Sequence, residues 1–236
     1  MTGRKEREKT MSEITGTTVE RNGETKGVTA TGSAVDARLA AHGDGIDMSV
    51  PAKLLESHEV YRGAIFRVED TVVGLTTTSG ELVRIRRQVL RHAPCVVMLV
   101  HDTLTDRYLI EREYRIGNDS FAYGLPAGLM DDGEDAREAA LRELREETGV
   151  TPIAPDRIRI DHVIDCYSSE GMTDELAHIM VIHLDGFNRV ERHFDQDEHV
   201  ESAWVGWNEL LATHVTASNS IIAIQHERIR RLRENA

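Results

Sequence analysis

Residues 128–150 read GLMDDGEDAREAALRELREETGV, and this stretch decides the interpretation of the whole chain. Its second part is rich in Ala, Glu, Arg and Leu, which are strong helix formers. Gly149 stands where a helix commonly ends on a residue in the left-handed conformation. We therefore predict a helix over residues 134–148, entered through a glycine-containing turn.

Three carboxylates gather on one side of this predicted helix. Glu143, Glu146 and Glu147 stand at i, i+3 and i+4, which places them within about one turn. One interpretation is a solvated helix face, since such charged strings are common on exposed helices. The other is a site for a hard divalent cation, which prefers oxygen ligands and removes the repulsion between the carboxylates. The nearby cations are all arginine, where a solvated face is expected to carry lysine partners: Arg137, Arg142 and Arg145.

The spacing of the fixed residues decides between these two interpretations. The stretch resembles the signature of the Nudix hydrolases, which reads Gly, five residues, Glu, seven residues, then Arg-Glu-aliphatic-any-Glu-Glu-any-Gly-aliphatic. A random match anywhere in the chain has a chance below roughly one in a million. The resemblance implies an α/β protein with the Nudix-type α/β/α sandwich around a mixed sheet, which hydrolyses a nucleoside diphosphate linked to another group. The matching positions are Gly128, Glu134, Arg142, Glu143, Leu144, Glu146, Glu147, Gly149 and Val150.

The resemblance also implies roles for the residues of the signature. The cofactor would be Mg²⁺, with Mn²⁺ as a substitute, and a carboxylate would take the proton from the attacking water. Glu146 and Glu147 would be catalytic, whereas Glu134, Arg142 and Gly149 would be structural. The implied metal ligands are the carbonyl of Ala127 and the side chains of Glu143, Glu146 and Glu147.

Residues outside the signature resemble the ADP-ribose pyrophosphatase branch of this family. Leu125-Pro126-Ala127-Gly128 leads into the signature, and Arg112-Glu113-Tyr114-Arg115 aligns with a strand end that reads Arg-Gln-Tyr-Arg in that branch. The implied reaction is the Mg²⁺-dependent hydrolysis of ADP-ribose to AMP and ribose 5-phosphate. Arg86 and Arg87 fall where the branch supplies substrate contacts across a dimer interface. The implied substrate-binding residues are Arg115, Gly128, Leu129, Ser169, Glu175 and Arg87.

One loop departs from this branch. Where the branch commonly has Ser-Pro-Gly followed shortly by Glu, this chain has Ser169-Glu170-Gly171 and then Glu175. Because proline fixes φ and stiffens such a loop, its replacement by Glu170 affects the expected contact to the terminal ribose. A second substrate therefore stays open: another nucleotide sugar or a dinucleoside polyphosphate.

A second acidic loop is the expected source of the general base. The sequence FDQDEHVESAWV precedes and includes a short strand with a Trp-Val pair, as in relatives that carry the base on such a loop. Glu198 is the best match, with Asp197 and Glu201 as alternatives. His199 could serve instead, because its ordinary pKa lies near neutrality.

The chain is predicted to consist of three parts. Residues 1–50 contain no aromatic side chain and show no helical or strand period, which is typical of a disordered arm. Residues 51–91 carry β-favouring runs, the first over residues 60–70, and predict a small antiparallel β module used for dimerisation. Residues 92–236 would form the Nudix hydrolase domain, and the expected assembly is a homodimer.

Composition limits the classes of function. The 236 residues carry a formal net charge of −13, which argues against nucleic acid as a partner because phosphate binding of that kind needs a basic face. The longest apolar run, residues 95–100, is too short to span a bilayer, so no membrane association is expected. Two cysteines make neither a disulfide framework nor a four-thiolate zinc site, which favours a cytoplasmic location.

A different class of function is a nucleotide sensor that regulates transcription. Sensors with a Nudix-like domain usually lose carboxylates of the signature and add a basic DNA-reading helical domain, whereas this chain keeps all of the carboxylates. Its last helix is locally basic. An apolar stripe along that helix nevertheless predicts that it packs against the domain: Ile221, Ile222, Ile224 and Ile229.

Overall fold

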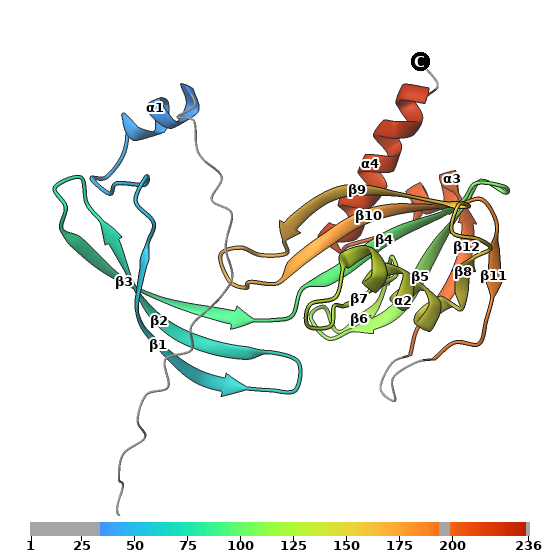
Figure 1. Ribbon diagram of the computed structural model, residues 1–236, viewed down its shortest axis with the longest axis horizontal. Coiled ribbons are helices and arrows are strands. Elements are labelled where there is room, and N and C mark those ends of the chain that lie inside the picture. The colour runs from blue at the N-terminus through green and yellow to red at the C-terminus, as the bar shows by residue number, and fades with distance from the viewer. Residues whose placement is uncertain (1–33, 194–198, 235–236) are drawn as a thin grey trace, which may run out of the picture. The chain divides into compact units, whose positions relative to one another are not determined.

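Two apolar strands, β4 (Cys95–Asp102) and β10 (Leu176–Leu184), lie at the centre of a mixed seven-stranded sheet in the computed structural model, which describes residues 34–193 and 199–234 (Figure 1). The two strands pair in parallel, and every residue of β4 is buried. A strand that is covered on both faces reads as a continuous apolar run. This explains why CVVMLVHD is recognisable as a strand from the sequence.

The other strands of this sheet pair antiparallel, in the order β12-β5-β4-β10-β9. β4 and β5 pair only at His101 with Tyr108 and at Asp102 with Arg107. Beyond that point the two strands diverge, because β6 pairs with β5 and β7 pairs with β4. Their bounds are β5 (Arg107–Arg115), β6 (Ser120–Gly124), β7 (Ala127–Leu129), β9 (Ile158–Tyr167) and β12 (Glu201–Gly206), while β8 (Val150–Pro152) and β11 (Phe187–Arg189) form a separate pair.

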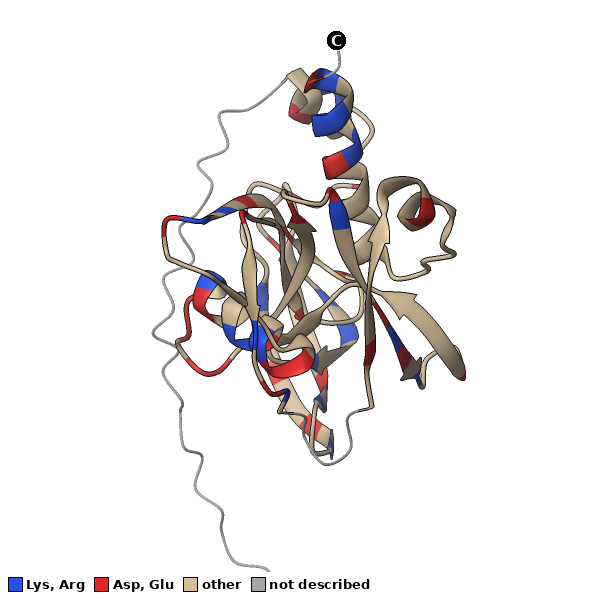
Figure 2. Cartoon of the chain, turned by 90° about the vertical axis from the view of Figure 1, so that its right-hand side faces the viewer, with Lys and Arg blue, Asp and Glu red and all other residues tan. Residues whose placement is uncertain are grey.

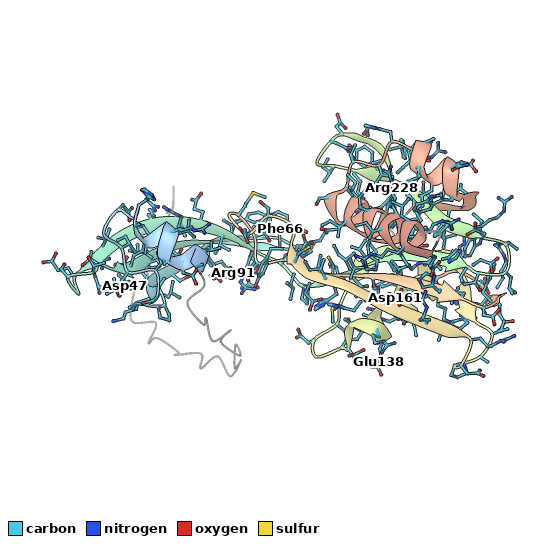
Figure 3. All side chains as sticks on the ribbon, turned by 90° about the horizontal axis from the view of Figure 1, so that it is seen from above. Asp47, Phe66, Arg91, Glu138, Asp161 and Arg228 are labelled. Carbon is cyan, nitrogen blue, oxygen red and sulfur yellow. The ribbon has the colours of Figure 1, made fainter. Side chains whose placement is uncertain are left out.

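Helices cover both faces of the sheet. Leu144 of α2 (Ala136–Thr148) packs into the buried cluster on one face, and Ile224 of α4 (Ser218–Glu234) into the cluster on the other, beside α3 (Trp207–Ala212). Figure 3 shows Glu138 of α2 and Arg228 of α4 on opposite sides of the strand that carries Asp161. The predicted α/β/α sandwich is thus confirmed. No helix in the described ranges is long and apolar enough to cross a membrane.

The signature helix begins two residues later than predicted. Asp135 is its N-cap and accepts hydrogen bonds from the backbone N–H groups of Arg137 (2.9 Å) and Glu138 (3.3 Å). A capping side chain of this kind satisfies amide groups that have no partner within the helix. Gly149 closes the helix with φ of 69°, as its position in the sequence predicts.

A three-stranded antiparallel sheet precedes the large one. Its strands are β1 (Lys53–Arg62), β2 (Arg67–Thr76) and β3 (Leu82–Arg91), in the order β1-β2-β3. The single run expected over residues 60–70 is wrong, because a turn closed by the bond from Gly63 N–H to the carbonyl of Phe66 divides it. Strand propensity alone does not predict such a turn.

The chain divides into two units, Met1–Gly45 and Ile46–Ala236, so both sheets belong to the second one. In the first unit, α1 (Ala34–Ala40) is a seven-residue helix with no buried residue. The expectation of no regular structure in residues 1–50 is therefore wrong for these seven residues, while residues 1–33 lie outside the described part. The boundaries predicted at residues 50 and 91 stay predictions.

Candidate active site

A cleft of about 890 Å³ opens where β4 and β5 diverge. Its walls come from β4 to β7, from the last turns of α2 and from the start of α4, and Figure 1 shows α2 beside β6 and β7. Most of the residues predicted to bind metal or substrate line it. They are Arg115, Ala127, Gly128, Leu129, Glu143, Glu146, Glu147 and Glu175.

The peptide between Ala127 and Gly128 runs against two of the carboxylates. The N–H of Ala127 donates to Oε2 of Glu147 at 3.3 Å. A Cβ atom on Gly128 would lie only 2.0 Å from the carboxyl carbon of Glu143, so any larger residue would displace that side chain. The carbonyl of Ala127 thus belongs to a backbone segment that lies against both carboxylates. This set of oxygen atoms is of the type that Mg²⁺ prefers.

Arg142 ties the signature together. Its guanidinium donates to both oxygens of Glu134 at 2.8 and 2.9 Å and to the carbonyl of Leu129 at 2.9 Å. The hydrogen bonds from Arg142 and from the backbone N–H of Asp131 lower the pKa of the Glu134 carboxyl to about 2. The structure therefore contains the contact between Arg142 and Glu134 that the resemblance implies, and it attaches the loop before α2 to the helix.

The same guanidinium also reaches two of the predicted metal ligands. It donates to Glu143 at 2.8 Å and to Glu146 at 3.1 Å. Among the residues that the structure describes, no three His, Cys, Asp or Glu side chains are already arranged around a common metal position. A cation bound here would therefore share the carboxylates of Glu143 and Glu146 with Arg142, or these side chains would have to turn.

Two predicted substrate-binding residues line the cleft from segments other than α2. Arg115 lies near the end of β5 and pairs with Glu113 at 2.8 Å. Glu175 lies just before β10, with Oε1 3.4 Å from Nδ1 of His92. The cleft thus offers a guanidinium for phosphate and a carboxylate for hydroxyl groups, as well as the cluster on α2.

Two other predicted substrate residues do not line this cleft. Ser169 is exposed, and its carbonyl accepts from the N–H groups of Met172 and Thr173 in a turn between β9 and β10. The structure therefore does not bring Ser169 to this cleft, and its contact with substrate stays a prediction. Arg87 is exposed on β3 and donates to the carbonyl of Arg86. Its predicted contact belongs to a partner's cleft and stays a prediction.

The candidate bases fall partly outside the described chain. Glu198 and Asp197 lie in residues 194–198, which the structure does not describe. Glu201 is exposed on β12 and pairs with Arg112 of β5, and His199 is exposed beside that strand. Neither Glu201 nor His199 lines the cleft.

Several residues of the cleft have no counterpart among the sequence predictions. His92 lines the cleft next to Glu175. Glu111 lies on β5 with 6% of its surface exposed, and His193 follows β11. The sequence holds one signal for Glu111: it directly follows the apolar residues Tyr108 to Ile110, which are buried in the core.

Comparison with known proteins gives a consistent result. A family model described as NUDIX domain matches residues 91–223. The chain is 26% identical over 180 residues to the methanol dehydrogenase activator of Bacillus methanolicus, covering 74% of this chain and 91% of that protein. It is 25% identical over 155 residues to the ADP-ribose pyrophosphatase of Bacillus subtilis, with 65% and 77% covered.

A shorter match and a solved structure add to these. The ADP compounds hydrolase NudE of Escherichia coli is 34% identical over 96 residues, which cover 41% of this chain and 50% of that protein. The crystal structure of an ADP compounds hydrolase superposes with a TM-score of 0.62 at 22% identity, covering 79% of this chain and 97% of the other. At that identity the superposition establishes the fold alone.

Proposed function

We propose, since this chain belongs to the Nudix hydrolase family by its match over residues 91–223, that it hydrolyses the pyrophosphate bond of ADP-ribose to AMP and ribose 5-phosphate. The family match confirms the resemblance in the signature. The proposed substrate follows from two independent points: the residues around Ala127 and Arg115 resemble the ADP-ribose pyrophosphatase branch, and a relative that bears this name is 25% identical.

The proposed cofactor is Mg²⁺, with Mn²⁺ as a substitute. Glu143 and Glu147, with the carbonyl of Ala127 and with Glu146, would hold the cation. When bound, Mg²⁺ would withdraw charge from the pyrophosphate oxygens and lower the pKa of a water molecule. Glu146, or Glu198 in the undescribed loop, would take the proton from that water. Arg115 would bind phosphate as a fixed positive charge.

The observation that carries this proposal is the approach of the Ala127–Gly128 peptide to two carboxylates. A solvated helix face would not place Glu147 with only 7% of its surface exposed or pack backbone against Glu143. The test is to mix the purified chain with ADP-ribose and Mg²⁺ and to measure AMP by chromatography. We expect AMP and ribose 5-phosphate in equal amounts. If another nucleotide sugar is cleaved while ADP-ribose is not, the substrate assignment is overturned.

A second substrate class is favoured by the position of Ser169. Because this residue forms an exposed turn and does not line the cleft, the expected contact to the terminal ribose is missing from the described residues. A relative named for ADP compounds in general, at 34% identity, points the same way. Other ADP-linked sugars and dinucleoside polyphosphates therefore belong in the same assay. A higher kcat/KM for one of them than for ADP-ribose would select it.

The proposed assembly is a homodimer formed through the β1–β3 sheet. Apart from Thr71 and Gly74, no residue of β2 is buried, although β2 is the middle strand. Exposed apolar surface of this extent is typical of interfaces. We expect light scattering to give twice the mass of the chain, and a monomer with full activity would contradict the assignment. The exposed apolar residues are Leu54, Val60, Tyr61, Leu82 and Val83.

The proposed location is the cytoplasm, on the grounds of the cysteines. Cys95 and Cys166 are both free, and Cys95 is buried. Burial raises the pKa of the Cys95 thiol to about 12, which keeps it in the unreactive protonated form. Unpaired thiols of this kind are compatible with a reducing compartment.

A further inference from the structure

Glu111 occupies a position in β5 that would ordinarily belong to the core. Tyr108 and Ile110 pack into the buried cluster on the α4 face of the sheet, and Leu109 packs into the cluster on the α2 face. Because successive side chains of a strand alternate between faces, Glu111 shares the α2 face with Leu109. Only 6% of Glu111 is exposed, and it lines the cleft.

Glu111 and Glu147 approach the cleft from two elements that share this core. On α2, Leu144 belongs to the same cluster as Leu109, and Glu147 follows Leu144 by one helical turn. On β5, Glu111 follows Leu109 by two residues. Each glutamate thus follows the shared apolar cluster on the same face of its own strand or helix. Both line the same cleft.

Strand register relates Glu111 to Glu147 in a second way. Glu111 of β5 pairs with Gly124 of β6. Ala127 of β7 pairs with Val97 of β4. The segment from Gly124 to Ala127 therefore runs from the residue that pairs with Glu111 to the backbone N–H that binds Glu147. The strand partner of Glu111 thus lies three residues before the backbone N–H that binds Glu147.

The charges of the cleft are strongly unbalanced. Its arginines are Arg115 and Arg142. Because the carboxylates far outnumber them, the lining stays negative whatever ion pairs form. A divalent cation is the ordinary means by which proteins neutralise such a group of oxygen atoms. The lining carboxylates are Glu111, Glu113, Asp131, Glu143, Glu146, Glu147 and Glu175.

We propose that Glu111 helps to hold the divalent cation from the sheet side, opposite the glutamates of α2. This inference rests on the proposed function, because it presupposes that the cleft binds a cation. Glu111 would then complete the ligand set without any contribution from the undescribed loop. Its carboxylate is carried by a strand of the central sheet, so its position is fixed before the substrate enters.

The test measures Mn²⁺ binding to the full chain without nucleotide, using the electron paramagnetic resonance signal of free Mn²⁺. Glu111→Gln is expected to weaken Mn²⁺ binding about tenfold or more, the range found for groups that support a metal site. Glu111→Asp keeps the charge and should bind Mn²⁺ more tightly than Glu111→Gln. The matched control is Glu113→Gln, two residues along the same strand and also in the cleft, which should stay within about twofold of the unaltered chain.

Thermal unfolding separates a metal role from a structural one. Without Mn²⁺, Glu111→Gln should melt at or above the temperature of the unaltered chain, because it removes a buried charge from an acidic group. With Mn²⁺, its gain in melting temperature should be smaller, because the ligand stabilises the folded state in proportion to its binding. A variant that melts lower without Mn²⁺ yet binds Mn²⁺ normally would assign a structural role and overturn the inference.

The outcomes also distinguish this inference from the proposed function. If Glu147→Gln loses Mn²⁺ binding while Glu111→Gln keeps it within twofold, only the inference about Glu111 is overturned. If the unaltered chain binds no Mn²⁺, both the inference and the proposed cofactor are overturned. Weakened binding in both variants, with the control unchanged, supports the assignment.

Discussion

The buried glutamate of α4 and the acidic residues of the cleft are neutralised differently. At α4, Glu227 is fully buried and accepts hydrogen bonds from Tyr108 Oη at 2.6 Å and from two nitrogen atoms of Arg230 at 2.6 Å. Burial alone would raise the pKa of this carboxyl, but the contacts with Arg230 and Tyr108 outweigh it and hold the pKa below its usual range. Figure 2 shows the acidic and basic residues banded along α4 beside the C terminus.

In the cleft, by contrast, the chain does not supply enough positive charge of its own. Arg142 is shared between Glu134, Glu143 and Glu146, and Arg115 pairs with Glu113. The difference separates a structural ion pair from the proposed cation site. At α4, Arg230 of the same helix neutralises Glu227, and the hydrogen bond from Tyr108 to Glu227 links the helix to β5, whereas the lining of the cleft keeps a surplus of negative charge.

Replacing Glu147 by Gln should have the largest effect on function. This change removes a negative charge from the proposed cation site while keeping the shape of the side chain. We expect kcat/KM on the best substrate to fall on the order of 1,000-fold, equivalent to about 4 kcal/mol of transition-state stabilisation. The measurement is steady-state hydrolysis with Mg²⁺, with circular dichroism to show that the fold is kept.

The matched control for this change is Glu138→Gln. Glu138 lies on the same helix, is exposed and does not line the cleft. Its replacement should leave kcat/KM within about twofold, since surface substitutions rarely have larger effects. Equal losses of kcat/KM in both variants would mean that the total charge of α2 determines activity and that Glu147 has no individual role.

At α4 the expected effect is on stability and not on turnover. Glu227→Ala leaves Arg230 and the hydroxyl of Tyr108 without their buried acceptor. Breaking a buried ion pair in this way destabilises a protein by roughly 3 kcal/mol or more. Urea unfolding should show this loss, while the folded fraction should retain its kcat. A variant of normal stability but low kcat would contradict the contrast between the two groups.

Gly128→Ala is a smaller disturbance within the cleft. The new Cβ would lie 2.0 Å from the carboxyl carbon of Glu143, so that carboxylate must move. We expect Mg²⁺ to be bound and used about 10- to 100-fold less well, read from the Mg²⁺ dependence of turnover. Gly117→Ala is the control, because a Cβ there meets nothing within 4 Å. A normal Mg²⁺ dependence in Gly128→Ala would remove the main observation behind the cation site.

Local spacing made the helix side of the site predictable. The order of Glu143, Glu146 and Glu147 fixes their common side as soon as a helix forms, and Gly149 marks its end. The central strands were predictable for a similar reason, since β4 is buried on both faces and reads as an apolar run.

The sheet side of the site was not predictable, because it depends on contacts between distant segments. Residues 120–129 show no clear alternation and include Pro126, so β6 and β7 were not expected. The divergence of β4 from β5, which these strands cause, is what opens the cleft to Glu111 and His92. The turn that contains Ser169 was not predictable either, because a motif match carries no information on local hydrogen bonding.

The smallest expected effect concerns the acid stability of the Arg142 contact in the cleft. The pKa of Glu134 is lowered from 4.5 to about 2, mainly by the hydrogen bonds from Arg142. Since the folded pKa lies below the unfolded one, the contact stabilises the protein above about pH 4.5, and this contribution is lost as the pH falls toward 2. Arg142 is partly exposed, so solvent screening limits the contribution to about 1 kcal/mol.

The measurement is the free energy of unfolding in urea at pH 7 and at pH 3 for the unaltered chain and for Glu134→Gln. The unaltered chain should lose about 0.6 kcal/mol more between the two pH values than the variant, because most of the contribution is lost by pH 3 and the variant has no carboxyl at residue 134 to protonate. Glu138→Gln again serves as the control and should lose as much as the unaltered chain. If Glu134→Gln shows the full loss as well, the contact with Arg142 does not stabilise the fold. Arg142 would then be available to bind a ligand. It would differ still more from Arg230, whose pairing with Glu227 is structural.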